Sequence, residues 1–122
     1  MPLPRPYRIL VLGGALPAYF DASEEEKRDV FLPAFRGLLA HWEHDLEARV
    51  VASFCDDVLQ VGPAEPGRWA WYLIFEVDDL DVAAQMIGAV REPIDGVRLD
   101  RYARFEVRVG RPFWAREASA PR

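Results

Sequence analysis

Two apolar runs constrain the fold of this 122-residue chain more than any other feature. Residues 69–77 read WAWYLIFEV, with one charged side chain, and residues 7–15 read YRILVLGGA, an apolar run that is closed by glycines and an alanine. Runs of this kind are typical of strands that lie buried in the centre of a sheet. The chain therefore needs a sheet with two central strands and further segments that cover it.

A long amphipathic segment follows the first of these strands. Residues 21–47 read DASEEEKRDVFLPAFRGLLAHWEHDLE, in which Ser23 and Glu26 have the spacing of a capping box. The pattern predicts a helix over about residues 24–45, and Pro33 should kink it or remove one backbone hydrogen bond. Its apolar side chains recur at helical spacing and form one stripe: Phe31, Phe35, Leu38, Leu39, Trp42 and Leu46.

The remaining segments complete the topology. Residues 48–59 (ARVVASFCDDVL) and 99–111 (LDRYARFEVRVGR) have strand character, and residues 78–92 (DDLDVAAQMIGAVRE) open with Asp caps and continue at helical spacing. The resulting order is β-α-β-β-α-β, which predicts an α+β ferredoxin-like fold with two helices on one face of a four-stranded antiparallel sheet of order 4-1-3-2. We expect a single domain with a flexible arm at 1–6, a core at 7–110 and a tail at 111–122.

Composition excludes several classes of protein. The net charge of −5 argues against a nucleic-acid binder, and no apolar window approaches the length of a membrane-spanning helix. Cys55 is the single cysteine, which fits a reducing compartment, and the first residues lack the pattern of a signal peptide. We therefore expect a cytoplasmic protein that contacts neither nucleic acid nor membrane.

The alternation of side chains assigns the residues of each strand to two faces. The almost wholly apolar set should lie under the helices and includes Val50, Ala52, Phe54 and Asp56 of the second strand, together with Trp69, Trp71 and Phe105. The other set has an apolar centre and a charged rim, which is typical of a protein interface. It predicts a homodimer through the open sheet face, or alternatively a solvated face, and the residues expected there are Tyr72, Tyr102, Arg104, Glu106 and Arg108.

Three stretches resemble a known family. They read DDVLQVGP, WAWYLIFEVDDLDVAAQMIGAVREP and RLDRYARFEVRVGRPF, and they cover about residues 54–113. This part of the chain resembles small bacterial proteins encoded with indole-3-acetate catabolism and related aromatic or secondary-metabolite pathways. The topology is similar to the dimeric α/β-barrel superfamily, which includes isomerases, polyketide cyclases, cofactor-free monooxygenases and haem-degrading enzymes. The resemblance implies a sheet-to-sheet dimer and an aromatic ligand between sheet and helices, and it carries over no catalytic residue.

Both histidines lie in the segment AHWEHD, residues 40–45. Helical phase places His44 roughly 160° from the centre of the apolar stripe and His41 about 100° away, so the two cannot both face the core. No further Cys or His set accompanies them, so we expect no metal site. His41 and Asp45 are neighbours at i and i+4, which makes them either a general acid/base pair or an ordinary surface pair. Asp56 is either a carboxylate with a raised pKa or the solvated end of an edge strand.

The aromatic residues suggest a ligand site. Trp42, Phe54, Trp69, Trp71 and Phe105, with Tyr72 nearby, could clamp a flat ring or simply fill the core. The first functional hypothesis is a homodimeric enzyme that acts on an aromatic or polycyclic metabolite by cofactor-free acid/base chemistry, as an isomerase, a dehydratase or cyclase, or a monooxygenase. The alternatives are a non-catalytic binding or accessory protein of a partner oxygenase, and a haem or metal binder through His41.

Overall fold

The computed structural model describes residues 6–59, 61–62, 69–113 and 115–116. Most of the predicted arm, most of the segment 60–68 and most of the predicted tail lie outside these residues. Within the described part, no helix has the length and hydropathy needed to cross a bilayer.

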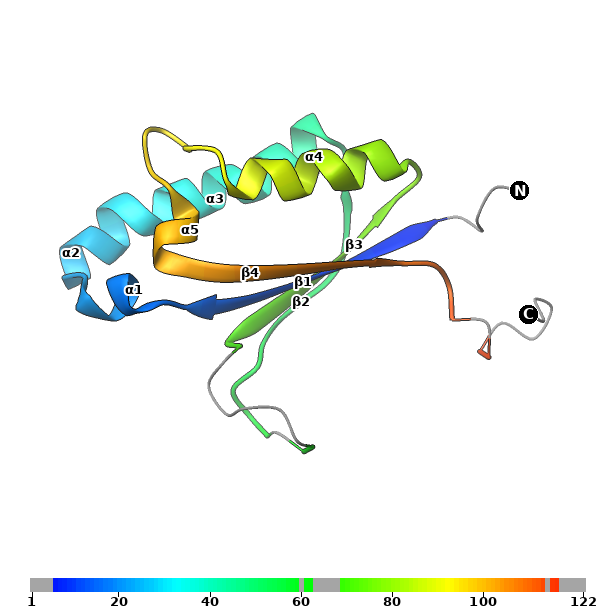
Figure 1. The fold of residues 1–122 in the computed structure, drawn as a ribbon, viewed down its shortest axis with the longest axis horizontal. Helices are drawn as coiled ribbons and strands as arrows, with labels where there is room; N and C mark the ends of the chain where they lie inside the picture. The colour runs from blue at the N-terminus through cyan, green and yellow to red at the C-terminus, as the bar shows by residue number, and fades with distance from the viewer. Residues whose placement is uncertain (1–5, 60, 63–68, 114, 117–122) are drawn as a thin grey trace.

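Four described strands form one antiparallel sheet: β1 (Tyr7–Ala15), β2 (Arg49–Cys55), β3 (Trp71–Val77) and β4 (Ala103–Gly110). Their order is β2-β3-β1-β4, which is the predicted order 4-1-3-2 read from the other edge. The two apolar runs are therefore the central strands, as expected, and the sheet is open rather than closed into a barrel. Figure 1 shows the long helices on one face of this sheet, while no described helix covers the other face.

The predicted helix over residues 24–45 is present and continuous. It consists of α2 (Glu24–Glu26), η1 (Lys27–Phe31), α3 (Leu32–Ala40) and η2 (His41–Asp45), in which η1 and η2 are single π-turns. The Ser23 side chain caps its start by accepting a hydrogen bond of 3.0 Å from the backbone N–H of Glu26.

Pro33 explains the first π-turn. In a regular α-helix its ring would press on the carbonyl of Asp29, four residues earlier, and one backbone hydrogen bond would be lost. Here the N–H of Leu32 instead donates to the carbonyl of Lys27, five residues back, which widens the helix just before the proline. The expected disturbance at Pro33 thus takes the form of a wide turn inside an unbroken helix.

Three further helices lie in the described part of the chain. α4 (Leu80–Val90) is the second predicted helix, and the Asp79 side chain caps it by accepting from the N–H of Asp81 at 2.8 Å. Two short helices were not predicted: α1 (Pro17–Asp21), which follows β1, and α5 (Leu99–Tyr102), which precedes β4. Pro17 occupies the first turn of α1, where a missing N–H costs nothing.

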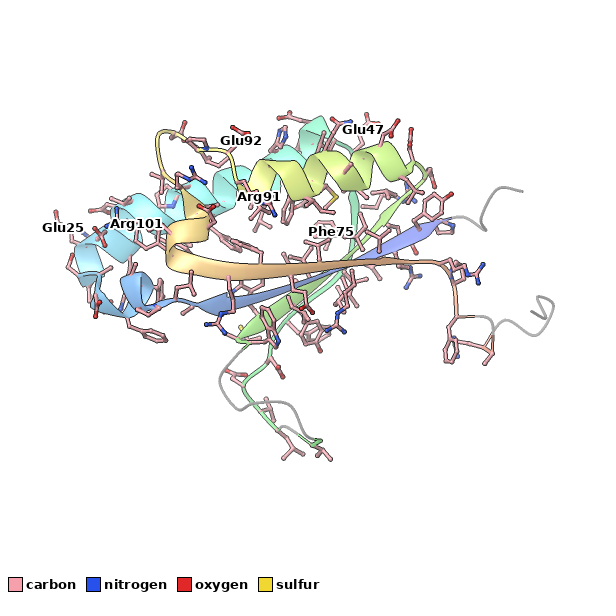
Figure 2. All side chains as sticks on the ribbon, viewed as in Figure 1. Glu25, Glu47, Phe75, Arg91, Glu92 and Arg101 are labelled. Atoms are coloured by element: carbon pink, nitrogen blue, oxygen red, sulfur yellow. The ribbon has the colours of Figure 1, made fainter. Side chains whose placement is uncertain are left out.

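The core lies between the sheet and the two long helices. Ile9 and Val11 of β1 and Phe75 of β3 are fully buried beneath Leu38 and Trp42, and Figure 2 shows Phe75 between the sheet and α4. The Trp42 indole meets the Phe75 ring edge-on at 5.5 Å between centroids, and its Nε1–H donates to the carbonyl of Met86 in α4 at 3.2 Å. One side chain therefore joins both helices to the sheet.

The face predicted for β2 is wrong beyond Val50. Val50 pairs with Phe75, but Ala52 pairs with the next residue of β3, Ile74, so Val51 is an extra residue in a β-bulge. The bulge reverses the alternation of every later residue. Phe54 consequently pairs with Tyr72 on the open face, at 5.5 Å between ring centroids, and Asp56 is exposed just beyond the end of the strand.

Tyr102 also differs from its predicted place. It was expected on the open face within a strand predicted over residues 99–111, yet it ends the short helix α5 and is 6% exposed. Strand alternation begins only at Ala103. From there the prediction is confirmed: Phe105 and Val107 share the helix face with Gly13 and Val11, and Glu106 and Arg108 share the open face with Leu12 and Leu10.

Gly13 is required by the packing of Trp71. The two residues are paired across β1 and β3, and a Cβ atom built at Gly13 would overlap the indole ring. We expect Gly13→Ala to lower the free energy of unfolding by about 1–3 kcal/mol, because the indole must leave its position over β1. Urea denaturation followed by circular dichroism measures this change.

Gly88→Ala is the matched control. A Cβ at Gly88 meets nothing within 4 Å, and this glycine lies inside α4. Alanine should therefore stabilise the protein by up to about 1 kcal/mol. Equal stability of Gly13→Ala and the wild type would contradict the packing described for Trp71.

Candidate functional site

An apolar cavity lies between the sheet and the first half of the long helix. Its volume is about 460 Å³, within the usual range of ligand sites, roughly 300–1,000 Å³. We call it the aromatic pocket. It is lined by Ala15, Tyr19, Phe31, Leu32, Phe35, Ser53, Phe54, Cys55, Ala70, Trp71, Leu73, Tyr102 and Ala103.

A cluster of rings lies beside the aromatic pocket, and of its members Trp71 and Phe35 line the pocket whereas Phe105 does not. Trp71 and Phe105 come from the strands on either side of β1, and their rings meet at 5.7 Å between centroids. Both contact Phe35 of α3, at 5.1 Å and 6.3 Å respectively. This three-ring contact is possible because Gly13, between Trp71 and Phe105 in the sheet, has no side chain.

The two short helices build the end wall. The N–H of Leu16, just before α1, donates to the carbonyl of Tyr102 in α5 at 2.8 Å, which holds these helices together. Each then places a tyrosine ring against Phe31: Tyr19 at 5.2 Å and Tyr102 at 5.6 Å between centroids. Phe31 is therefore flanked by the two phenols of the pocket.

The polar groups of the pocket lining are few and uncharged. Among the described residues that line it, the polar side-chain groups are the hydroxyls of Tyr19, Tyr102 and Ser53, the thiol of Cys55 and the indole N–H of Trp71. Two cations lie near its walls without lining it. The Lys27 ammonium is 4.9 Å from the centroid of the Tyr19 ring, and the Arg101 guanidinium is 5.8 Å from that of Tyr102. The site is thus suited to a neutral, flat, apolar molecule.

A bidentate ion pair holds the start of α5. Arg98 donates to Asp100 from Nε at 3.2 Å and from Nη2 at 2.9 Å. These hydrogen bonds lower the pKa of the Asp100 carboxyl, so the carboxylate is favoured at neutral pH. Because this folded-state pKa is lowered, the small contribution of the pair is present at neutral pH and is lost as the pH falls through that pKa.

His41 and Asp45 form the predicted pair away from the aromatic pocket. His41 Nδ1 lies 2.8 Å from Asp45 Oδ2, and both side chains are substantially exposed. His41 borders a separate depression of about 410 Å³ together with Gln85, Gly88, Ala89, Glu92 and Ile94. Figure 2 shows Glu92 on the outer side of the helix layer. Neither His41 nor Asp45 is among the residues that line the aromatic pocket.

The predicted binding residues separate into two groups. Trp71 lines the pocket, and Phe54 borders it from β2 although the Phe54 ring lies beside Tyr72 on the open face. Phe105 packs against Trp71 but is not among the lining residues. Trp42 lies in the sealed core, Tyr72 on the open face, and Trp69 just before β3 outside the lining. Asp56 is exposed, and its N–H extends the ladder by donating to the carbonyl of Ala70 at 2.7 Å.

The pocket also contains residues that the sequence did not indicate as site residues. Phe31 and Phe35 were recognised only as part of the helical stripe, and Tyr102 only as an interface residue. Tyr19 had one usable signal, the Pro17 that begins a short helix. Ser53 and Cys55 face the pocket only because of the β-bulge, and no local sequence pattern predicted that bulge.

Among the described residues, no group of three or more His, Cys, Asp or Glu side chains could hold a metal ion. His41 has one carboxylate neighbour, Asp45, and His44 is exposed.

No family model matches the sequence, and no curated protein matches it. Two solved structures are similar, both of RPA0582, a protein of unknown function from Rhodopseudomonas palustris. One has 19% identity and a TM-score of 0.57, and covers 88% of this chain and 82% of that one. The other, of the methylated protein, has 20% identity and a TM-score of 0.59, and covers 91% and 83%. At this identity the likeness shows a shared fold alone.

Two neighbouring substitutions in η2 test which of its side chains stabilises the fold. Trp42→Phe removes the hydrogen bond to Met86 and part of a sealed side chain, so we expect a loss of roughly 1–3 kcal/mol in the free energy of unfolding. His41→Ala removes one half of an exposed pair and should cost less than about 1 kcal/mol. Thermal and urea unfolding measure both, and a larger cost for His41→Ala than for Trp42→Phe would contradict this assignment.

Proposed function

We propose that this protein binds a flat aromatic small molecule in the aromatic pocket. The observation that carries the proposal is the composition of the walls, in which six aromatic residues and no charged one surround about 460 Å³ of space among the described residues. Such rings gain free energy from stacked or edge-on contact with another ring. The mainly apolar lining with a few polar groups is the usual character of a small-molecule site.

The sequence resemblance points in the same direction. Members of the dimeric α/β-barrel superfamily often hold an aromatic ligand between the sheet and the helices, and the aromatic pocket occupies that position here. Membership of that superfamily, and of the smaller family linked to indole-3-acetate catabolism, is part of the proposal. The shared fold with the Rhodopseudomonas palustris protein is compatible with it.

We favour binding over acid/base catalysis by the predicted residues. His41, Asp45 and Asp56 all lie outside the pocket lining, so none stands beside a ligand held there. A general base must come within hydrogen-bond reach of the proton that it removes. Cofactor-free catalysis by these residues therefore remains a prediction with less geometric support than a binding or accessory role, and so does a haem site at His41.

We also propose a homodimer through the open face of the sheet. Leu10 and Leu12 of β1 and Ile74 of β3 lie at its centre, beside the aromatic pair Phe54–Tyr72. Charges surround this apolar centre: Arg8 pairs with Glu76 at 2.6 Å, and Arg108 with Glu106. An apolar centre with a polar rim supports a two-fold interface between identical sheets.

A pocket-filling substitution tests the binding proposal. Ser53 borders the aromatic pocket from an exposed position on β2, so Ser53→Phe should occupy the space without disturbing the core. Equilibrium dialysis should show saturable binding of naphthalene to the wild type, at one site per chain, and at least ten-fold weaker binding to the variant. Ala84→Phe adds the same bulk on the exposed side of α4 and should bind as the wild type does. Absence of saturable binding to the wild type would refute the proposal.

A charge on the open face tests the dimer. Light scattering should give about twice the 13.9 kDa of one chain for the wild type. Ile74→Glu should give a folded monomer, because a carboxylate would be buried without a partner in the interface. Ala84→Glu places the same charge on α4 and should remain dimeric. A monomeric wild type would refute the interface.

A further inference from the structure

We propose that the Tyr102 hydroxyl anchors the ligand, and that the aromatic pocket selects neutral oxygenated aromatics, such as phenols, over both hydrocarbons and carboxylates. This inference rests on the proposed binding function. It goes further by naming the polar group that orients the ligand and by stating that the ligand is uncharged.

Tyr102 is the most buried of the polar side chains in the lining. It is 6% exposed, its ring is fixed against Phe31, and the Leu16 hydrogen bond holds its backbone. Within the described part of the chain, the Tyr102 hydroxyl makes no hydrogen bond, and no buried polar side-chain atom there is left unsatisfied. The hydroxyl oxygen is therefore not sealed in the core. Tyr102 lines two spaces, the aromatic pocket and a second depression of about 530 Å³ that Val97, Arg98 and Arg101 also border, and we assign its hydroxyl to the aromatic pocket.

The other polar groups are less suited to this task. Tyr19 is half-exposed and its ring already contacts the Lys27 ammonium. Ser53 and Cys55 are exposed on the edge strand β2, where water competes for their hydrogen bonds. Tyr102 alone combines rigidity, burial and an available hydroxyl, which can both donate and accept a hydrogen bond.

The charge of the ligand follows from the lining. A carboxylate that enters an apolar pocket loses its hydration and needs a cation or several donors in return. Arg98 is engaged by Asp100, and neither Lys27 nor Arg101 lines the aromatic pocket. A phenolic or carbonyl oxygen is uncharged, so a single tyrosine hydroxyl is sufficient to satisfy it.

Three probes of similar shape separate the effect of the hydrogen bond from the effect of ligand charge. They are naphthalene, neutral 2-naphthol and anionic 2-naphthoate, and their binding is measured by equilibrium dialysis at pH 7. On the wild type we expect 2-naphthol to bind at least five-fold more tightly than naphthalene, because one hydrogen bond is gained. We expect 2-naphthoate to bind at least ten-fold more weakly than 2-naphthol. Equal binding of 2-naphthol and naphthalene, or binding of 2-naphthoate as tight as that of 2-naphthol, would overturn the inference.

Tyr102→Phe keeps the ring and removes only the hydroxyl. It should bind naphthalene as the wild type does, which also shows that the pocket is folded, and should lose the preference for 2-naphthol. Tyr7→Phe, in the core and outside the pocket lining, is the matched control and should keep that preference. Persistence of the preference in Tyr102→Phe, or its loss in Tyr19→Phe, would overturn the assignment of Tyr102.

The design distinguishes this inference from the proposal on which it rests. If the wild type binds naphthalene without preferring 2-naphthol, only the role of Tyr102 is refuted. If it binds neither compound, the proposed function itself is refuted, and this inference with it.

Discussion

The Trp71 indole can lie across the central strand β1 only because position 13 has no side chain. From there it reaches Phe105 on the far side of β1 and Phe35 of the helix above. Large rings, rather than short aliphatic side chains, thus separate α3 from this end of the sheet. Rings of this size leave unfilled space beside them, and that space is the aromatic pocket. The site therefore depends on a single glycine in the sheet.

The two halves of the long helix have different tasks. Its second half is sealed: Leu38 and Trp42 are at most 1% exposed, and Trp42 connects α4 to the sheet. Its first half presents Phe31 and Phe35, which remain partly accessible because they face the pocket. The core that stabilises the fold and the cavity that could hold a ligand are consequently built from one continuous stripe of side chains.

Local sequence patterns were sufficient to predict the architecture, but they were insufficient to predict which residues line the pocket. Periodicity within short windows was enough to predict three features: the strand order, the helix over residues 24–45 and the contact between His41 and Asp45. The position of Phe54 depends on a bulge in the pairing of two strands, which is a property of neither strand alone. Tyr102 lies in a four-residue helix, too short to show a period. The separation of His41 from the pocket is decided by how the helices pack.

The bulge in β2 has a consequence beyond the face of Phe54. A sheet of this kind exposes two edges, and an unpaired edge can template the addition of strands from other molecules. The β4 edge carries the alternating charges of Arg104, Glu106 and Arg108, which resist such growth. The β2 edge carries a single charged residue, Arg49 at its start, and next to it Val50 and Val51 are exposed. The irregular backbone at Val51 interrupts the regular spacing of the hydrogen-bonding groups on this edge, and an edge interrupted by a bulge is a poorer template for an added strand.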